Sequence, residues 1–437
     1  MMNKSIRAFS LHAAGAAVAM LLTLPSTAQE RKLPPPEQTD PVTLAIMKGF
    51  PPPQEKIVTL GNLLKYPNSR WGFQHIRELG PTAAVWRGKV AVSPLPDAAR
   101  QIGNIGFQDN GGQQVSIDDW QKNTYTDGLL VLHKGQIVYQ KYYSGMRPET
   151  PHALWSLSKS FTGLLSRILI QENKLDPNAR VSEYLPELAD TAWGNATVQQ
   201  TLDMTTSAQY REVFTDPKSE IFQYLFAGGI LPAPKDYAGP KTTYDFLKTV
   251  KKDSEHGNGF KYKSVDTEVM GWVLSRITGK SFAELVSDRI WSQIGAEEDA
   301  YVWVDPAGTA LSSIGLNATL RDLGRLGEAL RMGGRINGRQ AIPQAVVAEL
   351  RKGGDREKFK ANGQSVRTGY SYHDFWWNPH DADGSFEAKG LNGQHIHINP
   401  AAELVIVKLS SHPVGDTGFT HDLDRRAFAA IAKAVGQ

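Results

Sequence analysis

The chain has 437 residues, 41% of them hydrophobic and 21% charged, a composition typical of a globular protein with a large core. Because 48 Lys and Arg stand against 45 Asp and Glu, the formal charge of +3 favours neither nucleic acid nor an anionic membrane as a partner. The sequence contains no cysteine, which excludes disulfides, thiol catalysis and cysteine-ligated metals.

Residues 1–28 are predicted to be a secretory signal peptide. Positive charge at Lys4 and Arg7 precedes an apolar run over residues 11–24, and cleavage is expected after Ala28. The alternative, a membrane anchor, is disfavoured because a spanning helix needs ~20 apolar residues. We therefore expect a periplasmic or secreted protein without stable membrane insertion.

Residues 29–95 are expected to form a proline-rich arm that lies along the body of the protein. Two proline triplets, at 34–36 and 51–53, lack amide donors and have a fixed φ, which disfavours regular structure. After the arm, β-branched and aromatic residues alternate over 128–143 around Lys134 and Gly135. This pattern predicts a β-hairpin.

The middle of the chain is predicted to be helical, and strands return near its end. Apolar residues recur at three- and four-residue spacing in the helical part, and Thr319 with Asp322 resembles a capping box. Helices are expected over 267–277, 282–294, 319–332 and 422–435, and strands over 394–398 and 404–410.

Strands at both ends with helices between them predict an α+β fold, an α/β/α sandwich. Its antiparallel sheet is expected to be flanked by helices, with a helical domain inserted between the two halves. The sheet domain would comprise residues 96–165 and 300–437, and the mainly helical inserted domain residues 166–299. Catalytic groups would lie in the crevice between them.

A single Ser-x-x-Lys occurs in the chain, formed by Ser156 and Lys159. Residues three apart at the start of a helix share a face, so the lysine amine can reach the serine hydroxyl. Burial and the positive helix end would lower the lysine pKa, and the neutral amine could then activate the hydroxyl as a base. The four-residue pattern is also common in surface helices, so its meaning depends on the other motifs.

A Tyr-x-Ser, Tyr262 to Ser264, follows about a hundred residues later. A phenol beside an amine can relay a proton from the nucleophile to the leaving group. The alternative is a buried tyrosine with a turn serine. Similar patterns at Tyr66 and Tyr142 precede the Ser-x-x-Lys, so chain order selects Tyr262.

The third element is the glycine-rich segment 388–394, just before the last strand pair. Glycine lets a strand edge approach a substrate closely. The backbone amides of Leu391 and Ser156 are therefore predicted to form an oxyanion hole. Taken alone, the segment is only a glycine-rich turn.

These three elements, in this order and at this spacing, resemble the serine β-lactamase and penicillin-binding superfamily, in particular its esterase and 6-aminohexanoate-dimer (nylon-oligomer) hydrolase branch. The resemblance extends from about Trp71 to the C-terminus and includes segments 193–197, 202–206 and 321–327. It implies an acyl-enzyme on the serine, the lysine as general base, the tyrosine as proton relay, and hydrolysis without metal or cofactor.

The chain departs from these relatives at two places. Penicillin-recognising members have Lys-Thr-Gly or His-Thr-Gly where this chain has Ala388-Lys389-Gly390, and a shift of one residue turns Lys389 to the opposite face of the strand. We therefore expect weak β-lactam hydrolysis at best. The tyrosine and aspartate that hold the amino end of nylon oligomers align with Phe214 and Leu225, which implies an uncharged ester or amide acyl chain.

Three other patterns are interpreted as structural. The tripeptide 416–418, Asp-Thr-Gly, is assigned to a loop, and the aromatic residues 375–377 to the core instead of a sugar platform. His395 and His397 share a strand face, as zinc ligands would, but without a third ligand they are expected to be polar rim residues. The sequence has no Gly-x-Ser-x-Gly, which disfavours an α/β-hydrolase.

The leading interpretation is an exported esterase or amidase that acts on a small molecule without cofactor or metal. A D-Ala-D-Ala peptidase would need a basic residue directed into the pocket from 388–390, and a catalytically silent sensor would share only the scaffold. The sequence leaves the oligomeric state open. The candidate substrate-binding residues are Trp155, Phe214, Ser264, Gly390 and Asn392.

Overall fold

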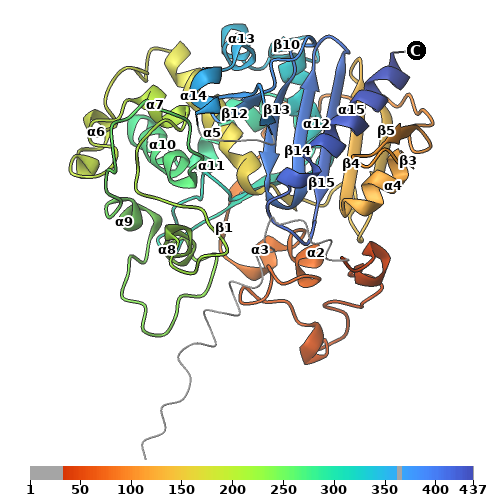
Figure 1. The fold of residues 1–437 in the computed structure, drawn as a ribbon, viewed down its shortest axis with the longest axis horizontal. Helices are drawn as coiled ribbons and strands as arrows, with labels where there is room; N and C mark the ends of the chain where they lie inside the picture. The colour runs from red at the N-terminus through yellow and green to blue at the C-terminus, as the bar shows by residue number, and fades with distance from the viewer. Residues whose placement is uncertain (1–32, 362–366, 437) are drawn as a thin grey trace, which may run out of the picture.

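The computed structural model describes residues 33–361 and 367–436. The predicted signal peptide lies outside the described residues. A sheet of seven antiparallel strands dominates the fold, in the order β11-β12-β13-β14-β15-β4-β5 (Figure 1). These strands are β4 (Thr126–His133), β5 (Gln136–Tyr142), β11 (Ser371–His373), β12 (Trp376–Asn378), β13 (Phe386–Gly390), β14 (Gln394–Asn399) and β15 (Leu404–Ser410).

Strands from distant parts of the chain pair side by side in this sheet. Strand β15 pairs with β4, and Ile406 lies opposite Val131. The hairpin predicted over 128–143 is therefore confirmed as β4 and β5, and the two predicted C-terminal strands as β14 and β15. The antiparallel sheet and its flanking helices confirm the predicted fold class.

Helices cover both faces of the sheet. Helix α15 (His421–Val435) packs on one face, where alternate residues such as Val131 and Ile406 contact Phe428 and its neighbours. Helix α12 (Leu320–Arg331) lies behind the sheet in Figure 1. A Cβ on Gly327 of α12 would lie 2.5 Å from the Val405 side chain, so glycine is what allows this close contact.

The predicted helices are present, and the largest difference from their expected bounds concerns α11 and the segment after it. Helix α11 ends at Val286 and continues as a single π-helical stretch over Ser287–Trp291, where a helix to 294 was expected. The helices between β6 (His152–Ala153) and β7 (Ala300–Trp303) are α5 (Ser158–Gln171), α6 (Val181–Tyr184), α7 (Val198–Leu202), α8 (Glu220–Ala227), α9 (Thr243–Leu247), α10 (Ser264–Thr278) and α11 (Phe282–Val286).

A second, smaller sheet was not predicted. Its four strands, in the order β1-β7-β8-β6, are only two to four residues long, too short to show an alternating pattern. It joins the N-terminal arm to the segment that leads into Ser156. The strands are β1 (Thr82–Val85), β6 (His152–Ala153), β7 (Ala300–Trp303) and β8 (Leu316–Ala318).

The described part of the arm is built into the body of the protein. It contributes Ile46, Leu63 and Phe73 to the main hydrophobic core. Arg70 is buried, donates hydrogen bonds of 2.6 Å to the Ser144 hydroxyl and the Pro36 carbonyl, and lies 3.7 Å from the buried Asp127 carboxylate. These buried contacts attach the arm to β4. Its helices are α2 (Asn68–Gly72) and α3 (Ile76–Leu79).

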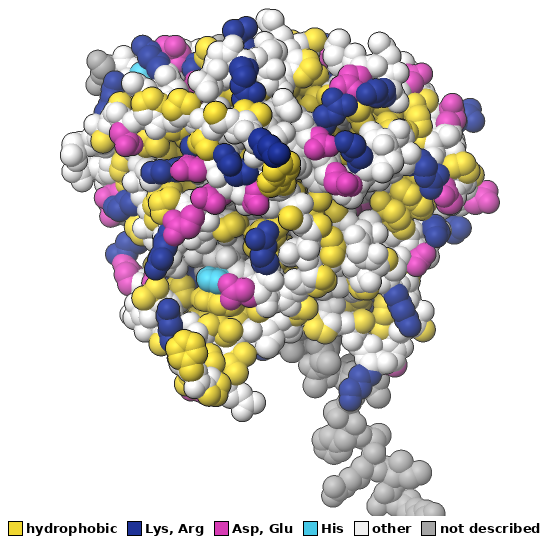
Figure 2. All heavy atoms as spheres, turned by 180° about the vertical axis from the view of Figure 1, so that it is seen from behind, with side chains coloured by type: hydrophobic (Ala, Val, Ile, Leu, Met, Phe, Trp, Pro, Cys, Tyr) yellow, Lys and Arg dark blue, Asp and Glu magenta, His cyan; other side chains and the backbone are white. Residues whose placement is uncertain are grey.

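Within the described residues, no helix is both long and apolar enough to span a bilayer. On the face opposite to that of Figure 1, cationic and anionic side chains are interspersed (Figure 2). The remaining elements are α4 (Ile117–Asn123), α13 (Gln344–Lys352), α14 (Arg356–Lys360), β2 (Gly106–Gln108), β3 (Gln114–Ser116), β9 (Arg335–Ile336) and β10 (Arg339–Gln340).

Candidate active site

Ser156 lies in a short 3-10 turn, Trp155–Leu157, that leads directly into α5. Lys159 follows one turn later on the same side of the helix. Its Nζ donates a hydrogen bond to Ser156 Oγ at 2.8 Å and lies 3.2 Å from the Ser313 carbonyl oxygen. The structure therefore brings together the two residues that the sequence motif paired.

The environment of Lys159 favours the neutral amine. The side chain is fully buried, and this desolvation lowers the pKa of Lys159 to about 8 against the opposing effect of the Glu212 and Glu268 carboxylates. An amine with this pKa is neutral in a useful fraction of molecules near neutral pH. It can then accept a proton from the adjacent hydroxyl.

We expect kcat/KM for an ester substrate to rise with pH through about 8, because the lysine becomes a base only when it loses its proton. The logarithm of kcat/KM should increase along this limb and then level off as the neutral amine becomes the major form. Steady-state rates measured over the pH range in which the protein stays folded test this expectation. A profile that is flat, or that falls with pH through this region, contradicts it.

Tyr262 lies just before α10 and is also close to Ser156. Its phenol lies close enough to the Ser156 side chain for that side chain to lower the pKa of Tyr262, and its ring centroid lies 5.1 Å from Lys159 Nζ. Burial, aided by the Glu212 carboxylate, raises the pKa of Tyr262 above its ordinary value of 10.0. The phenol therefore keeps its proton at neutral pH and is better suited to pass a proton than to start the reaction as a base.

The end of β13 lies against the turn that carries Ser156. A Cβ on Gly390 would be 2.2 Å from the Leu154 carbonyl oxygen, so a larger residue would push the strand away. Leu391, next in the chain, borders the same cavity as Ser156. Gly390, in the third motif, therefore allows the end of β13 to lie close to the backbone at Leu154.

Ser156 opens into a cavity of about 400 Å³. The five candidate substrate-binding residues all border it, namely Trp155, Phe214, Ser264, Gly390 and Asn392. Leu225, with Ile221 and Ile230, supplies an apolar wall from the helical region, and the arm adds Leu64. The sequence contained no signal for this contribution from the arm.

Asn392 and Ser264 shape the cavity through contacts made elsewhere. Asn392 has φ +62°, and its side-chain amide donates to the His412 carbonyl at 2.8 Å, which fixes the loop after β13. Ser264 begins α10, and its backbone N–H donates to the Glu212 carboxylate. Both residues border the cavity while these polar groups bind protein partners.

Glu212 is a cavity residue that sequence reasoning missed. It lies two residues before Phe214 in the segment that was aligned for substrate contacts, but only Phe214 and Leu225 were considered there. Its carboxylate borders the cavity close enough to Lys159 and Tyr262 to raise the pKa of both. Asp416 and Asp424 also border the cavity, so Glu212 is one of three acidic residues there and the one that lies in the segment carrying the apolar wall.

Lys389 has the orientation that the one-residue shift predicts. It shares the α15 side of β13 with Glu387, whose carboxylate lies 2.8 Å from its Nζ, while Ala388 faces the opposite core. The cavity curves around the end of β13, however, so Lys389 still borders it. Its charge is compensated by Glu387. A second cation, Arg367, also borders the cavity and lies over the Trp377 ring at 4.6 Å.

The prediction that His395 and His397 are rim residues was wrong. Both are buried, 5% and 4% exposed, because α15 covers the strand face that they share. His397 hydrogen-bonds to Glu387 at 2.9 Å, and burial lowers the pKa of His395 to about 4, which keeps it neutral. The aromatic segment 375–377 is buried as predicted.

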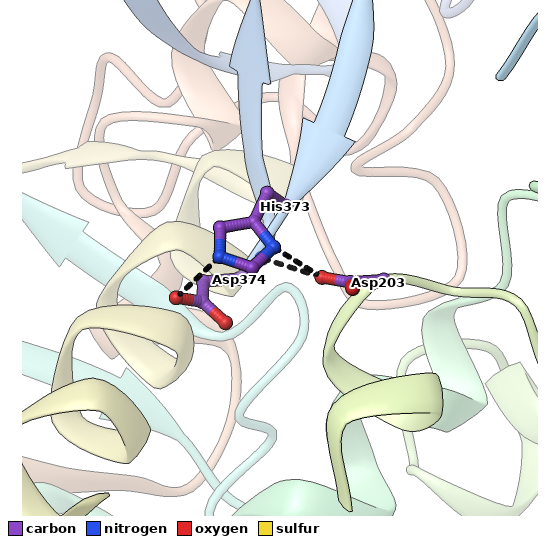
Figure 3. Close-up of side chains that lie close together, drawn as sticks. All are labelled: Asp203, His373 and Asp374. Atoms are coloured by element: carbon purple, nitrogen blue, oxygen red, sulfur yellow. Dashed lines mark hydrogen bonds and ion pairs between the residues drawn. The ribbon is translucent and has the colours of Figure 1, made fainter. Parts of the chain in front are cut away.

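The described residues contain one group of acidic and histidine side chains close enough to hold a metal ion, Asp203, His373 and Asp374 (Figure 3). Its chemistry is that of an ion-pair cluster. His373 Nδ1 lies 2.8 Å from Asp203, and Arg167 binds both Asp374 oxygens at 2.6 and 2.7 Å. Burial opposes the charge on His373, but Asp374 and Asp203 outweigh it and raise the pKa of His373 to about 9.

Replacing His373 with glutamine is expected to lower the free energy of unfolding by about 2–3 kcal/mol near neutral pH. The folded-state pKa of about 9 exceeds the ordinary 6.5, so this stabilisation is complete below pH 6.5 and is lost as pH rises through 9. Urea unfolding of wild-type and H373Q proteins at several pH values measures the difference. A difference that does not shrink at high pH argues against a charged His373.

The chain is similar to known proteins in sequence and in fold. A sequence model of the β-lactamase family matches residues 113–431. A 6-aminohexanoate-dimer hydrolase from Paenarthrobacter ureafaciens is 33% identical over 378 residues, which cover 86% of this chain and 94% of that protein. A Bacillus anthracis structure described as a candidate 6-aminohexanoate-dimer hydrolase has a TM-score of 0.80 at 34% identity and covers 88% of this chain and 98% of its own. A family VIII carboxylesterase shares the fold, with a TM-score of 0.54 at 16% identity over 72% of this chain and 95% of its own.

Proposed function

The chain belongs to the β-lactamase family and is a serine hydrolase, and we propose that it cleaves small esters or amides through an acyl-enzyme on Ser156. The observation that carries this proposal is the 2.8 Å contact between Lys159 Nζ and Ser156 Oγ. The lysine is buried, and its pKa is lowered to about 8. A serine hydroxyl is a weak nucleophile without such a base.

In the proposed reaction, neutral Lys159 accepts the Ser156 proton as Oγ attacks the substrate carbonyl carbon. The backbone N–H groups of Ser156 and Leu391 stabilise the resulting oxyanion. Tyr262 passes the proton to the leaving alcohol or amine, and the acyl group stays on Ser156. A water molecule then attacks the acyl-enzyme, with the same groups returning the proton to Ser156 Oγ.

We propose a substrate with a short apolar acyl chain. Phe214 and Leu225 border the cavity together with further aliphatic residues, and a cavity of about 400 Å³ suits a small ligand. Burial of each CH₂ of the chain contributes about 0.8 kcal/mol to binding. Rates on p-nitrophenyl esters of increasing chain length, and on linear amides, identify the preferred acyl group.

A second candidate substrate is an amide or ester whose acyl chain ends in an ammonium group. The Glu212 carboxylate in the cavity supports it, as do relatives named 6-aminohexanoate-dimer hydrolases. Matched esters of hexanoate and 6-aminohexanoate separate the two classes. A preference for the amino ester that is lost in E212Q supports the second class, and a preference for the neutral ester excludes it.

Hydrolysis of nitrocefin is expected to be weak compared with that of the best ester. β-Lactams and D-Ala-D-Ala peptides carry a carboxylate, and the lysine of 388–390 that could bind it is already paired with Glu387 at 2.8 Å. Initial rates on nitrocefin, a D-Ala-D-Ala peptide and short esters give the comparison. A rate on either carboxylate substrate that matches the best ester would favour the peptidase alternative.

A fluorophosphonate probe tests the proposal before any substrate is known. We expect stable labelling of wild-type protein at Ser156, located by mass spectrometry of the labelled peptide. Folded protein that resists labelling would favour a catalytically silent sensor.

We also propose export, with a mature N-terminus at Gln29, which N-terminal sequencing of the periplasmic or secreted protein would test.

A further inference from the structure

Glu268 is a buried carboxylate behind the catalytic lysine. It lies in α10 and is 1% exposed. Its oxygens accept hydrogen bonds from the Tyr224 hydroxyl at 2.6 Å, the Ser312 backbone N–H at 3.1 Å and hydroxyl at 2.9 Å, and the Ser313 backbone N–H at 3.0 Å. Four donors around one carboxylate are the arrangement that an ionised acid needs when it is removed from water.

The Ser312–Ser313 turn connects Glu268 to Lys159. Ser313 gives its N–H to Glu268, and its carbonyl oxygen lies 3.2 Å from Lys159 Nζ. The turn also packs tightly on α10, since a Cβ on Gly271 would lie 2.4 Å from Ser312 Oγ. Glu268 and α10 thus determine where the Ser313 carbonyl meets the lysine.

A neutral amine has two N–H groups and one lone pair, so its orientation decides whether it can act as a base. When one N–H of Lys159 donates to the Ser313 carbonyl, the lone pair can point to the Ser156 hydroxyl, 2.8 Å away. A displaced carbonyl would leave the amine free to rotate. Loss of such alignment reduces proton transfer even when both reacting groups remain.

We propose that Glu268 is a positioning residue for the catalytic base, which it holds toward Ser156 through the Ser312–Ser313 turn. This inference rests on the proposed function and adds a residue that the sequence motifs do not contain. Tyr224 extends the same network to the substrate cavity, because it borders the cavity and contacts both Glu268 and the Ser313 hydroxyl, the latter at 2.9 Å.

The charge of Glu268 affects the pH dependence of activity, which a purely structural role would leave unchanged. Three groups face Lys159 closely enough to matter: the Glu212 and Glu268 carboxylates, which raise its pKa, and the neutral Tyr262 phenol. Removing the charge of Glu268 should therefore lower the pKa of Lys159. The pH range over which activity increases would then move to lower pH.

The experiment is the second-order rate of fluorophosphonate labelling against pH for wild type, E268Q, E268D and a control, E328Q. In E268Q, we expect the rise of the labelling rate with pH to move by about half a pH unit or more to lower pH, because a nearby negative charge is lost. Its plateau rate should fall about 10- to 100-fold, since aligned general-base catalysis contributes about 10²- to 10⁴-fold. E328Q removes a buried carboxylate that pairs with Arg331 on α12, and both parameters should stay at wild-type values.

E268D keeps the charge but is one methylene shorter, so it cannot reach all four donors. We expect its limb to stay in place while its plateau rate falls, and this variant carries the test if E268Q does not fold by circular dichroism. If folded E268Q, or E268D in its place, shows the wild-type pH dependence and the wild-type maximal labelling rate, the inference about Glu268 is wrong. Labelling of the wild-type protein would then still support the proposed function. If the wild-type protein is not labelled, the proposed function and the inference about Glu268 are both wrong.

Discussion

Ser156→Ala is expected to abolish labelling and to lower kcat by about 10³-fold or more, because removal of a catalytic nucleophile leaves only binding and oxyanion stabilisation. The free energy of unfolding should change little, since the hydroxyl opens into the cavity and is hydrogen-bonded to Lys159. Steady-state kinetics, intact-protein mass spectrometry after labelling and urea unfolding measure the three quantities.

Ser158→Ala is the matched control on the same segment. The Ser158 hydroxyl is buried and accepts the Leu316 backbone N–H at 3.1 Å, so its loss leaves a buried donor unpaired. We expect S158A to be destabilised by about 1–3 kcal/mol yet still labelled. Retained labelling of S156A, or labelling lost in folded S158A, would show that the nucleophile lies elsewhere.

Lys159→Met is expected to lower kcat by about 10²- to 10⁴-fold, the usual contribution of a general base. Methionine has a similar length and no charge. Because the buried ammonium is costly to desolvate, K159M should be as stable as the wild type or more stable. Kinetics and urea unfolding of the same preparation therefore give opposite trends, which separates a catalytic effect from misfolding.

Lys159→Arg distinguishes a base from a positive charge. Arginine keeps the cation but does not lose its proton in proteins, so K159R should be as inactive as K159M if the lysine acts as a base. A K159R protein with substantial activity would instead indicate that Lys159 only stabilises negative charge.

Lys263 provides a second buried lysine beside the same tyrosine, 3.7 Å from Asp266. Because K263M removes this partner of Asp266, we expect it to lower stability. It leaves Ser156 and Lys159 in contact, so we expect folded K263M to retain labelling. Loss of labelling in that protein would weaken the assignment of the base to Lys159.

An apolar wall with the Glu212 carboxylate beside it distinguishes this cavity from a uniformly apolar pocket. Phe214 and Leu225 supply the wall, while Glu212 accepts the N–H of Ser264 at the start of α10. A substrate ammonium would have to share Glu212 with this helix terminus. The preference between neutral and amino acyl chains therefore depends on whether Glu212 can bind the Ser264 N–H and a substrate ammonium at once. Rates on the matched esters measure this preference.

The sequence by itself determined the features that depend on neighbouring residues. Alternation over 128–143 predicted β4 and β5, and the three-residue spacing of Ser156 and Lys159 sufficed to predict their contact, because helix geometry relates residues this close in the chain. Chain order and the family resemblance selected Tyr262. The one-residue shift of Lys389 correctly predicted its face of β13, since side chains alternate along a strand.

Only the tertiary structure decided which distant segments meet at the site. The Glu268 contact with the Ser312–Ser313 turn, the position of Glu212 and the arm's contribution of Leu64 join residues far apart in the chain, and no local spacing encodes them. The burial of His395 likewise depends on α15 folding back over the sheet. Local periodicity predicts elements and their faces, whereas the pairing of distant strands such as β4 and β15 in one sheet, and the helices that pack on it, decide what each face contacts.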